Sequence, residues 1–279
     1  MSVSTLAALF SKLASPTQEI RHLASGSSPA QNTQTCPIVS EWITASRAPT
    51  AGSTPGAAAT CDRTTAGALG QFNKAGTEQR AWLRRFDIAY ATGTQGTGMF
   101  MLVDRLAHVG GLSGTVTTAQ TVGFPALTRF TSGVGVWAGV EIYTGVGATG
   151  TTLTASYTNT VPTAGQTSQP IAFGGTGLNN IRRILPISLA AGDLGVTAMA
   201  SVTVLATTGT AGNFGVTLFK TLGAWPAVSV LPYLLNGAPL PYFGAMPAIP
   251  DNACLQLLYT GQNGPSSNTN VAVVDFFED

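Results

Sequence analysis

The 279-residue chain carries very little charge. Asp, Glu, Lys and Arg together make up 9% of the residues, far below the roughly 25% that is typical of soluble proteins. A free monomer ordinarily needs more surface charge to stay soluble, so the low value indicates that neighbouring subunits cover much of the outside. A low-charge secreted protein is the alternative interpretation.

The charges also have no dominant sign. The chain has 13 Lys and Arg against 12 Asp and Glu, a formal net charge of +1, so no overall field attracts nucleic acid or an anionic membrane. No apolar run approaches the roughly 18 to 20 residues of a membrane-spanning helix, and the N-terminal segment lacks the basic start of a secretory signal. We expect no nucleic-acid partner, no membrane partner, and assembly in a cytoplasm.

Histidine, the usual general base of nucleophilic catalysis, is scarce. The chain has 2 histidines, His22 and His108. A catalytic triad would combine Asp104, His108 and Ser113, but residues four apart on one strand lie roughly 13 Å apart. The glycines around Ser113 do not form the Gly-x-Ser-x-Gly turn that exposes a catalytic serine. We therefore interpret His108 as a structural or interface residue.

Carboxylates are scattered singly along the chain. Asp87, Asp104 and Glu141 are the candidates for a glycosidase pair, and nothing in their spacing selects two of them. The sequence has no Cys-x-x-Cys, no His-Glu-x-x-His, no Asp-rich calcium loop and no phosphate-binding loop. We expect a non-enzymatic protein with no catalytic residues, no metal and no cofactor.

Cysteine is too rare for a disulfide-rich scaffold. The 3 cysteines are Cys36, Cys61 and Cys254, an odd number. A bridge between Cys36 and Cys61 and a set of buried free thiols both remain open.

The first part of the chain predicts a docking region. Leu6, Phe10 and Leu13 recur at helical spacing and predict a short amphipathic helix over residues 3–14. Residues 25–67 are dense in Ser, Thr, Ala, Pro and Gly, which predicts an extended arm or a long surface loop. We expect residues 1–77 to form the N-terminal helix and docking arm, and residues 78–279 to form a β-rich body.

Short apolar runs separated by Gly-rich or Pro-containing turns follow from about residue 80 onward. This pattern predicts a mainly β fold, an antiparallel β-sandwich or a jelly-roll-like barrel. Over residues 134–143 aliphatic residues alternate with Gly, Trp, Glu and Tyr, which predicts a strand with its aliphatic face inward.

Two turns predict β-hairpins. The turn at residues 145–150 leads to a run at 152–159 with a Thr-rich face, which we expect to point outward from a hairpin. The segment 207–213 predicts a second hairpin turn between runs at 198–206 and 214–222. Further strands are predicted at 253–260 and 270–277.

Aromatic and apolar residues outside these strands are the candidates for partner contact. Residues 223–247 form the most apolar loop-like region and predict either core or a partner-facing patch, of which we favour the patch. The candidate contact residues are Leu6, Phe10, Leu13, Trp42, Trp225, Tyr233, Tyr242 and Phe243. In a carbohydrate-binding surface module, sugar rings would stack on Trp137, Tyr143, Trp225, Tyr233 and Tyr242.

Three segments resemble structural proteins of tailed-bacteriophage particles. They are "LVDRLAHVGGLSGTVTTAQTV" (102–122), "GVWAGVEIYTGVGATGTTLTASYTN" (135–159) and "LPISLAAGDLGVTAMASVTVLATTGTAGNFGVTL" (185–218), and they occur in the same order as in those proteins. Gln166 stands where those proteins often carry an arginine, so a contact made by that arginine would be absent or altered here.

The resemblance implies a part of a phage particle and carries no catalytic residues. Within that class we favour a capsid decoration, or cement, protein that bridges shell subunits and forms a small symmetric oligomer such as a trimer. Its partners would be the major capsid protein or other virion subunits. A tail, collar or fibre-docking protein and the carbohydrate-binding module are the alternatives.

Overall fold

In the residues that it describes, the computed structural model consists of β-strands joined by loops. It describes residues 20–27, 38–40, 42–43, 51–69, 81–92, 98–227, 248–261 and 269–278. The predicted mainly β class is confirmed. The helix predicted over residues 3–14 lies outside the described residues. Within the described ranges no helix is long and apolar enough to cross a membrane.

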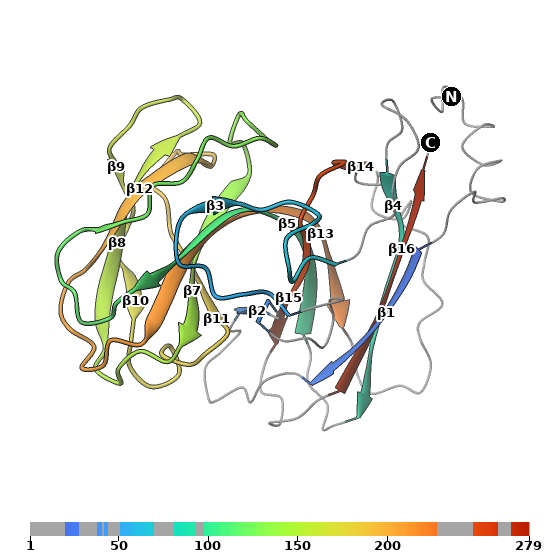
Figure 1. Cartoon of the computed structure of the whole chain (residues 1–279), viewed down its shortest axis with the longest axis horizontal. Coiled ribbons are helices and arrows are strands. Elements are labelled where there is room, and N and C mark those ends of the chain that lie inside the picture. Colours follow the sequence, from blue (N-terminus) through green and yellow to red (C-terminus); the bar gives the residue numbers. More distant parts are fainter. Residues whose placement is uncertain are drawn as a thin grey trace.

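Six strands close into an antiparallel barrel at the centre of the molecule (Figure 1). In order of neighbours around the ring they are β13 (Asn213–Ala227), β7 (Val136–Thr144), β11 (Arg183–Pro186), β2 (Ile38–Ser40), β15 (Leu255–Gly261) and β5 (Gly98–Leu112). The pairing of β5 with β13 closes the ring. The short strand β3 (Ala59–Thr60) continues along the same edge of β5 that β15 occupies.

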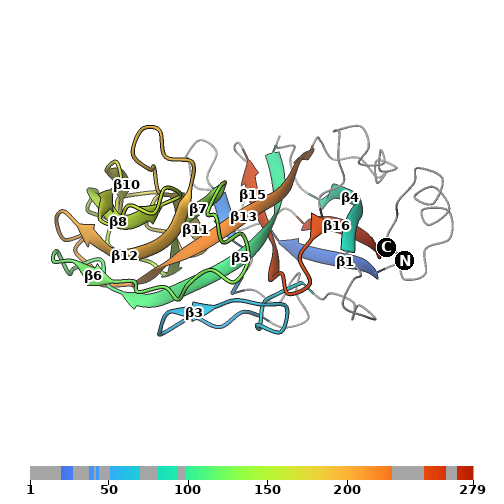
Figure 2. The ribbon, with the colours of Figure 1, turned by 90° about the horizontal axis from the view of Figure 1, so that it is seen from above.

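A second antiparallel sheet packs on the barrel wall and makes a sandwich with it. Its strands are β10 (Ile171–Phe173), β8 (Thr151–Asn159), β12 (Val196–Val204) and β6 (Gln120–Thr121), with β9 (Gln166–Thr167) paired to β8. Seen from above, this sheet lies at one end of the long axis and the barrel beside it (Figure 2).

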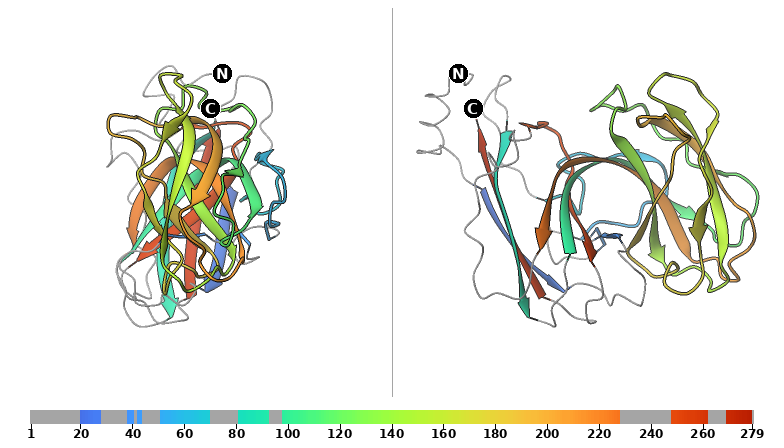
Figure 3. Two further views of the ribbon diagram at one scale, coloured as in Figure 1. Left: turned by 90° about the vertical axis from the view of Figure 1, so that its left-hand side faces the viewer. Right: turned by 180° about the vertical axis from the view of Figure 1, so that it is seen from behind.

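A third sheet stands on the other side of the barrel (Figure 3). Its strands, in order, are β1 (Ile20–Ser27), β16 (Thr269–Glu278), β4 (Ala81–Thr92) and β14 (Ala248–Ile249). β16 pairs with β4 along its whole length, so the last described strand of the chain is held between two earlier ones.

Strand β7 is buried on both faces, because one face lines the barrel and the other faces the second sheet. Val136, Val140 and Ile142 pack in the main core with residues of β8, β12 and β13. On the opposite face, Trp137 joins an apolar cluster to which each of the six barrel strands contributes; its members are Ile38, Met101, Val103, Trp137, Ile184, Phe219 and Leu258. From Val136 onward the aliphatic face is inward as predicted, but the opposite face is inward too. Val134, at the start of the predicted strand, lies before β7 and is exposed.

Both predicted hairpins are wrong, although the strands they would join are present. β7 belongs to the barrel, whereas β8 pairs with β10 and β12 in the second sheet. Likewise β12 lies in the second sheet and β13 in the barrel. Each turn therefore crosses from one sheet to the other. The apolar face of the barrel strand and the apolar face of the strand in the second sheet then meet in one core. The Thr-rich face of β8 is half-exposed, as expected.

Described residues of the predicted N-terminal arm lie within the β body. β2 is a barrel strand between β11 and β15, and β3 pairs with β5. Trp42 is fully buried, which corrects its assignment as a partner contact. A tryptophan buries a large apolar area on folding, and this gain explains why a segment rich in Ser, Pro and Gly is held against the barrel. The docking role of residues 1–77 stays a prediction.

At Gly215 the strand β13 leaves no room for a side chain against β5. The register of β13 against β5 shifts between Phe214 and Val216, which is a β-bulge. A Cβ atom at Gly215 would lie only 1.8 Å from the carbonyl oxygen of Val109. Only glycine therefore fits there without moving the backbone.

Replacing Gly215 with alanine is expected to lower the free energy of unfolding by about 2–3 kcal/mol, because the backbone of β5 must shift. Urea denaturation measures the change. Gly150→Ala is the matched control, since a Cβ there meets nothing within 4 Å, and its stability should stay within about 1 kcal/mol of the native chain. Equal stabilities for the two variants would contradict the register described here.

Candidate functional site

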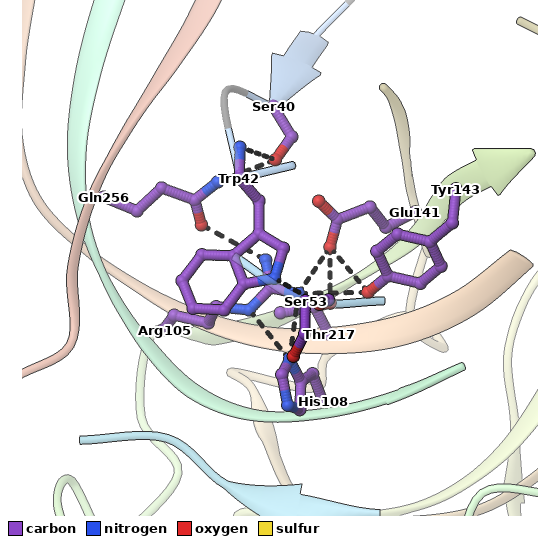
Figure 4. A network of polar contacts seen from close by, with 9 residues as sticks. All are labelled: Ser40, Trp42, Ser53, Arg105, His108, Glu141, Tyr143, Thr217 and Gln256. Carbon is purple, nitrogen blue, oxygen red and sulfur yellow. Dashed lines mark hydrogen bonds and ion pairs between the residues drawn. The ribbon is translucent and has the colours of Figure 1, made fainter. Parts of the chain in front are cut away.

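A network of polar side chains fills one part of the barrel, where Arg105 and Glu141 form an ion pair (Figure 4). The Arg105 Nη2 donates to Glu141 Oε2 over 2.7 Å and to Tyr143 Oη over 3.0 Å. Tyr143 Oη and Thr217 Oγ1 both donate to the same carboxylate oxygen, over 3.0 and 2.9 Å. Three strands, β5, β7 and β13, thus meet at one carboxylate.

The rest of the Arg105 guanidinium is held by other barrel residues. Its Nη1 donates to Gln256 Oε1 over 3.2 Å, and Gln256 Nε2 donates to Ser40 Oγ over 2.7 Å. Its Nε donates to His108 Nδ1 over 3.3 Å, which requires that the His108 proton sit on the other ring nitrogen. The network therefore also reaches β15 and β2.

Trp42 covers this network. Its ring lies over the Arg105 guanidinium, with 4.1 Å from Arg105 Cζ to the ring centroid, a cation–π contact strengthened by burial. Its indole N–H donates to the Ser53 carbonyl over 3.1 Å. Cβ atoms at Gly52 or Gly67 would lie 2.4 or 2.9 Å from the indole ring. The loop of residues 51–69 is thus packed directly on the tryptophan.

Burial and charge pairing set the proton affinities of the network. Burial opposes ionisation of Glu141, but the Arg105 guanidinium and the hydrogen bonds to the carboxylate outweigh it and hold its pKa below the usual range. Burial likewise works against the charge of Arg105, and Glu141 outweighs it, so the pKa of Arg105 is raised. Burial and the adjacent Glu141 charge raise the pKa of Tyr143. The pair is therefore charged at neutral pH.

A second buried ion pair involves Asp104, the residue of β5 directly before Arg105. Arg129 donates from Nε and Nη2 to the two oxygens of Asp104, over 2.8 and 2.9 Å. The backbone N–H of Cys254 donates to the same carboxylate over 2.8 Å, and Arg129 also donates to the carbonyl of Cys61 over 2.8 Å. Burial raises the pKa of Asp104, while Arg129 acts in the opposite direction.

The residues of the hypothetical triad do not meet. Asp104 is bound by Arg129, His108 contacts Arg105 and the edge of Trp42, and the Ser113 hydroxyl hydrogen-bonds with Thr115. Among the glycosidase candidates, Asp104 and Glu141 are each bound by an arginine inside the protein. The side chain of Asp87, on β4, and that of His22, on β1, lie outside the described part. Geometry of this kind favours a structural role for both ion pairs.

The aromatic candidates for sugar stacking separate into two groups. Tyr143 is buried in the ionic network, and Trp137 packs on Phe219 with ring centroids 4.7 Å apart. Tyr143 therefore offers no ring face to a sugar, which corrects its place among the stacking candidates, whereas Trp137 is partly buried. Trp225 lies on β13 opposite Phe100, and its side chain is outside the described part. The other aromatic and partner-contact candidates outside the described residues are Leu6, Phe10, Leu13, Tyr233, Tyr242 and Phe243.

No group of three or more His, Cys, Asp or Glu side chains suited to a metal ion occurs among the described residues. Sequence reasoning did not select Arg105 and Gln256, which hold the network together. The available signal was a pair of charges in the apolar run "LVDRLAH", since charged residues are almost never fully buried unless paired.

Comparisons with known proteins give only weak matches. No protein-family model matches the chain, and no curated protein does. Solved structures of infectious bursal disease virus are among the matches. The VP2 subviral particle has 11% identity and a TM-score of 0.21, covering 99% of this chain and 87% of the other. The virus-derived T=1 particle has 10% identity and a TM-score of 0.22, covering 94% and 78%. Likeness at this level establishes neither a shared fold nor a shared function.

We expect Glu141→Gln to lower the free energy of unfolding at pH 7 by about 3–5 kcal/mol, because Arg105 stays buried without its counter-charge. The pKa of Glu141 in the folded protein is depressed. Its ionised form therefore contributes to the free energy of unfolding above the carboxylate's usual pKa, and this contribution is lost as the pH falls through the pKa of the folded state. The difference in the free energy of unfolding between the native chain and the variant should therefore become smaller at acidic pH. Urea denaturation across pH measures it.

The double variant Arg105→Met with Glu141→Gln is the control for coupling. Removing both charges leaves no unpaired ion, so its loss of stability should be smaller than the sum of the two single losses. Additive losses would show that the two side chains do not depend on each other.

Proposed function

We propose that this chain is a non-enzymatic structural component of a virus particle, and specifically a bacteriophage capsid decoration protein that stabilises the head by bridging shell subunits. The sequence resemblance to tailed-phage structural proteins supports the class. A decoration protein contributes buried area across joints between subunits, and repeated contacts add up over the particle.

The resembling segments supply strands to both halves of the sandwich. Residues 102–122 include most of β5 and all of β6, and residues 135–159 contain β7 and β8. Residues 185–218 contain β12 and the first part of β13. The likeness therefore falls on the main core of the molecule.

An exposed aliphatic patch at one end of the sandwich carries the proposal. It consists of Val134, Val161 and Leu194, which are 51%, 71% and 66% exposed. Val134 forms a β-bridge with Gly195, the neighbour of Leu194. Val161 lies two residues after Asn159, where the end of β8 pairs with the start of β12. Clustered exposed aliphatic residues mark sites of contact with another protein, and we assign this patch to a neighbouring subunit of the particle.

Leu194→Asp tests the proposal, because a carboxylate placed in an apolar contact loses its water without gaining a partner. Phage particles assembled with this variant should contain at least about tenfold less of the chain, which corresponds to roughly 1.4 kcal/mol of lost contact energy. They should also release their DNA at a lower temperature and at low salt. Quantitative mass spectrometry of purified particles and a heat-release assay give the two readings.

Leu205→Asp is the matched control, because Leu205 is 76% exposed and follows β12 at its opposite end. This variant should enter particles as the native chain does, and both variants should melt at the native temperature when isolated. Normal incorporation of Leu194→Asp would contradict the patch assignment. Particles that lack the chain and yet withstand heat and low salt as well as complete ones would contradict the decoration role.

A further inference from the structure

Cys61 and Cys254 are brought together along one edge of β5. The backbone N–H of Cys61 donates to the carbonyl of Leu106, and the backbone N–H of Arg105 donates to the carbonyl of Cys254, both over 2.9 Å. Cys61 directly follows β3, and Cys254 directly precedes β15. Both strands run antiparallel to β5 and lie one after the other along it. Cys61, at the end of β3, is therefore next to Cys254, at the start of β15.

The two thiols belong to one buried cluster. Both side chains are fully buried in one cluster with Trp42 and Tyr143, and both are free thiols in this structure. Their backbones are bonded to neighbouring residues of β5, Leu106 and Arg105. Two cysteines at adjacent positions along a strand edge, with side chains in one buried cluster, are placed for a disulfide, which needs Cα atoms within about 7 Å of each other.

The surroundings make the two sulfurs chemically different. The hydrogen bond from Cys254, assisted by His108 and the Arg105 charge, lowers the pKa of Cys61 against the effect of burial. The same hydrogen bond and burial raise the pKa of Cys254. Cys61 is thus the nucleophile of the pair, since the thiolate is the reactive form. Cys254 is placed to resolve an oxidised Cys61.

We propose that Cys61 and Cys254 are a redox-active pair that forms a reversible disulfide when the protein meets a peroxide. The Cys61 thiolate attacks one oxygen of hydrogen peroxide; the O–O bond breaks, Cys61 becomes a sulfenic acid and the released hydroxide takes a proton to form water. The Cys254 sulfur then attacks the Cys61 sulfur; the S–O bond breaks, the S–S bond forms and a second water leaves. Two thiols are oxidised, and one peroxide is reduced to two waters.

The disulfide would fasten the loop that covers Trp42 to the barrel wall. It would join residues separated by roughly 190 positions in the chain, and cross-links that close long loops remove much entropy from the unfolded state. This inference does not depend on the proposed function.

The test uses the full chain with Cys36→Ser, which leaves only the two cysteines of interest. After treatment with hydrogen peroxide, the protein is denatured and its free thiols are labelled with a maleimide. We expect the loss of two thiols, a cross-linked peptide containing Cys61 and Cys254, and a rise in Tm of about 5 °C or more. Dithiothreitol should reverse all three changes.

Cys36→Ser with Cys254→Ser is the control, in which Cys61 lacks its partner. Peroxide should give it a sulfenic or sulfinic acid detectable by mass, no cross-link and no rise in Tm. The proposal is overturned if both thiols of the Cys36→Ser chain stay free, or if they oxidise without a cross-link. It is also overturned if the native chain joins Cys61 to Cys36 instead of to Cys254.

Discussion

The ion pair of Arg105 and Glu141 is the constraint on which the barrel depends. Both side chains are removed from water, and this desolvation is unfavourable unless each charge is surrounded by matching hydrogen bonds. The bonds come from Tyr143, Thr217 and Gln256, which lie on three different strands. A shift of register in any of these strands would leave a buried charge without its partners, so the pair favours a single arrangement of the barrel.

Three of the barrel strands also join the barrel to the sandwich. β5, β7 and β13 place one face inside the barrel and the other in the main core. Strands that are buried on both faces carry few charged residues. This architecture is therefore one reason why only 9% of the residues are charged. Val134, Val161 and Leu194 stay exposed at one end of the sandwich.

Much of the fold could be predicted from alternation in the sequence. The strands β7, β8, β12, β13, β15 and β16 fall where apolar runs predicted them. Their pairing could not be predicted, because an alternating pattern shows which face of a strand is buried and not which strand lies beside it. A six-residue turn after β7 suits a hairpin and a crossing between sheets equally well.

The candidate site was less accessible to prediction. Trp42 stands in a segment whose composition is that of a loop, and its burial depends on Arg105 and on glycines that are distant or unremarkable in the sequence. Glu141 was singled out as a carboxylate, but its partner on β5 is 36 positions away. Such long-range contacts are set by strand register and leave no local pattern.

As a capsid decoration protein, this chain would be a repeated part of a virus shell. The most direct test is the copy number of the chain per purified phage particle, determined by quantitative mass spectrometry against the major shell protein. The account predicts parity with the shell protein or a simple large fraction of it. A count equal to one or two rings of subunits would place the chain in the tail or collar, and its absence from particles would contradict the assignment to a virion.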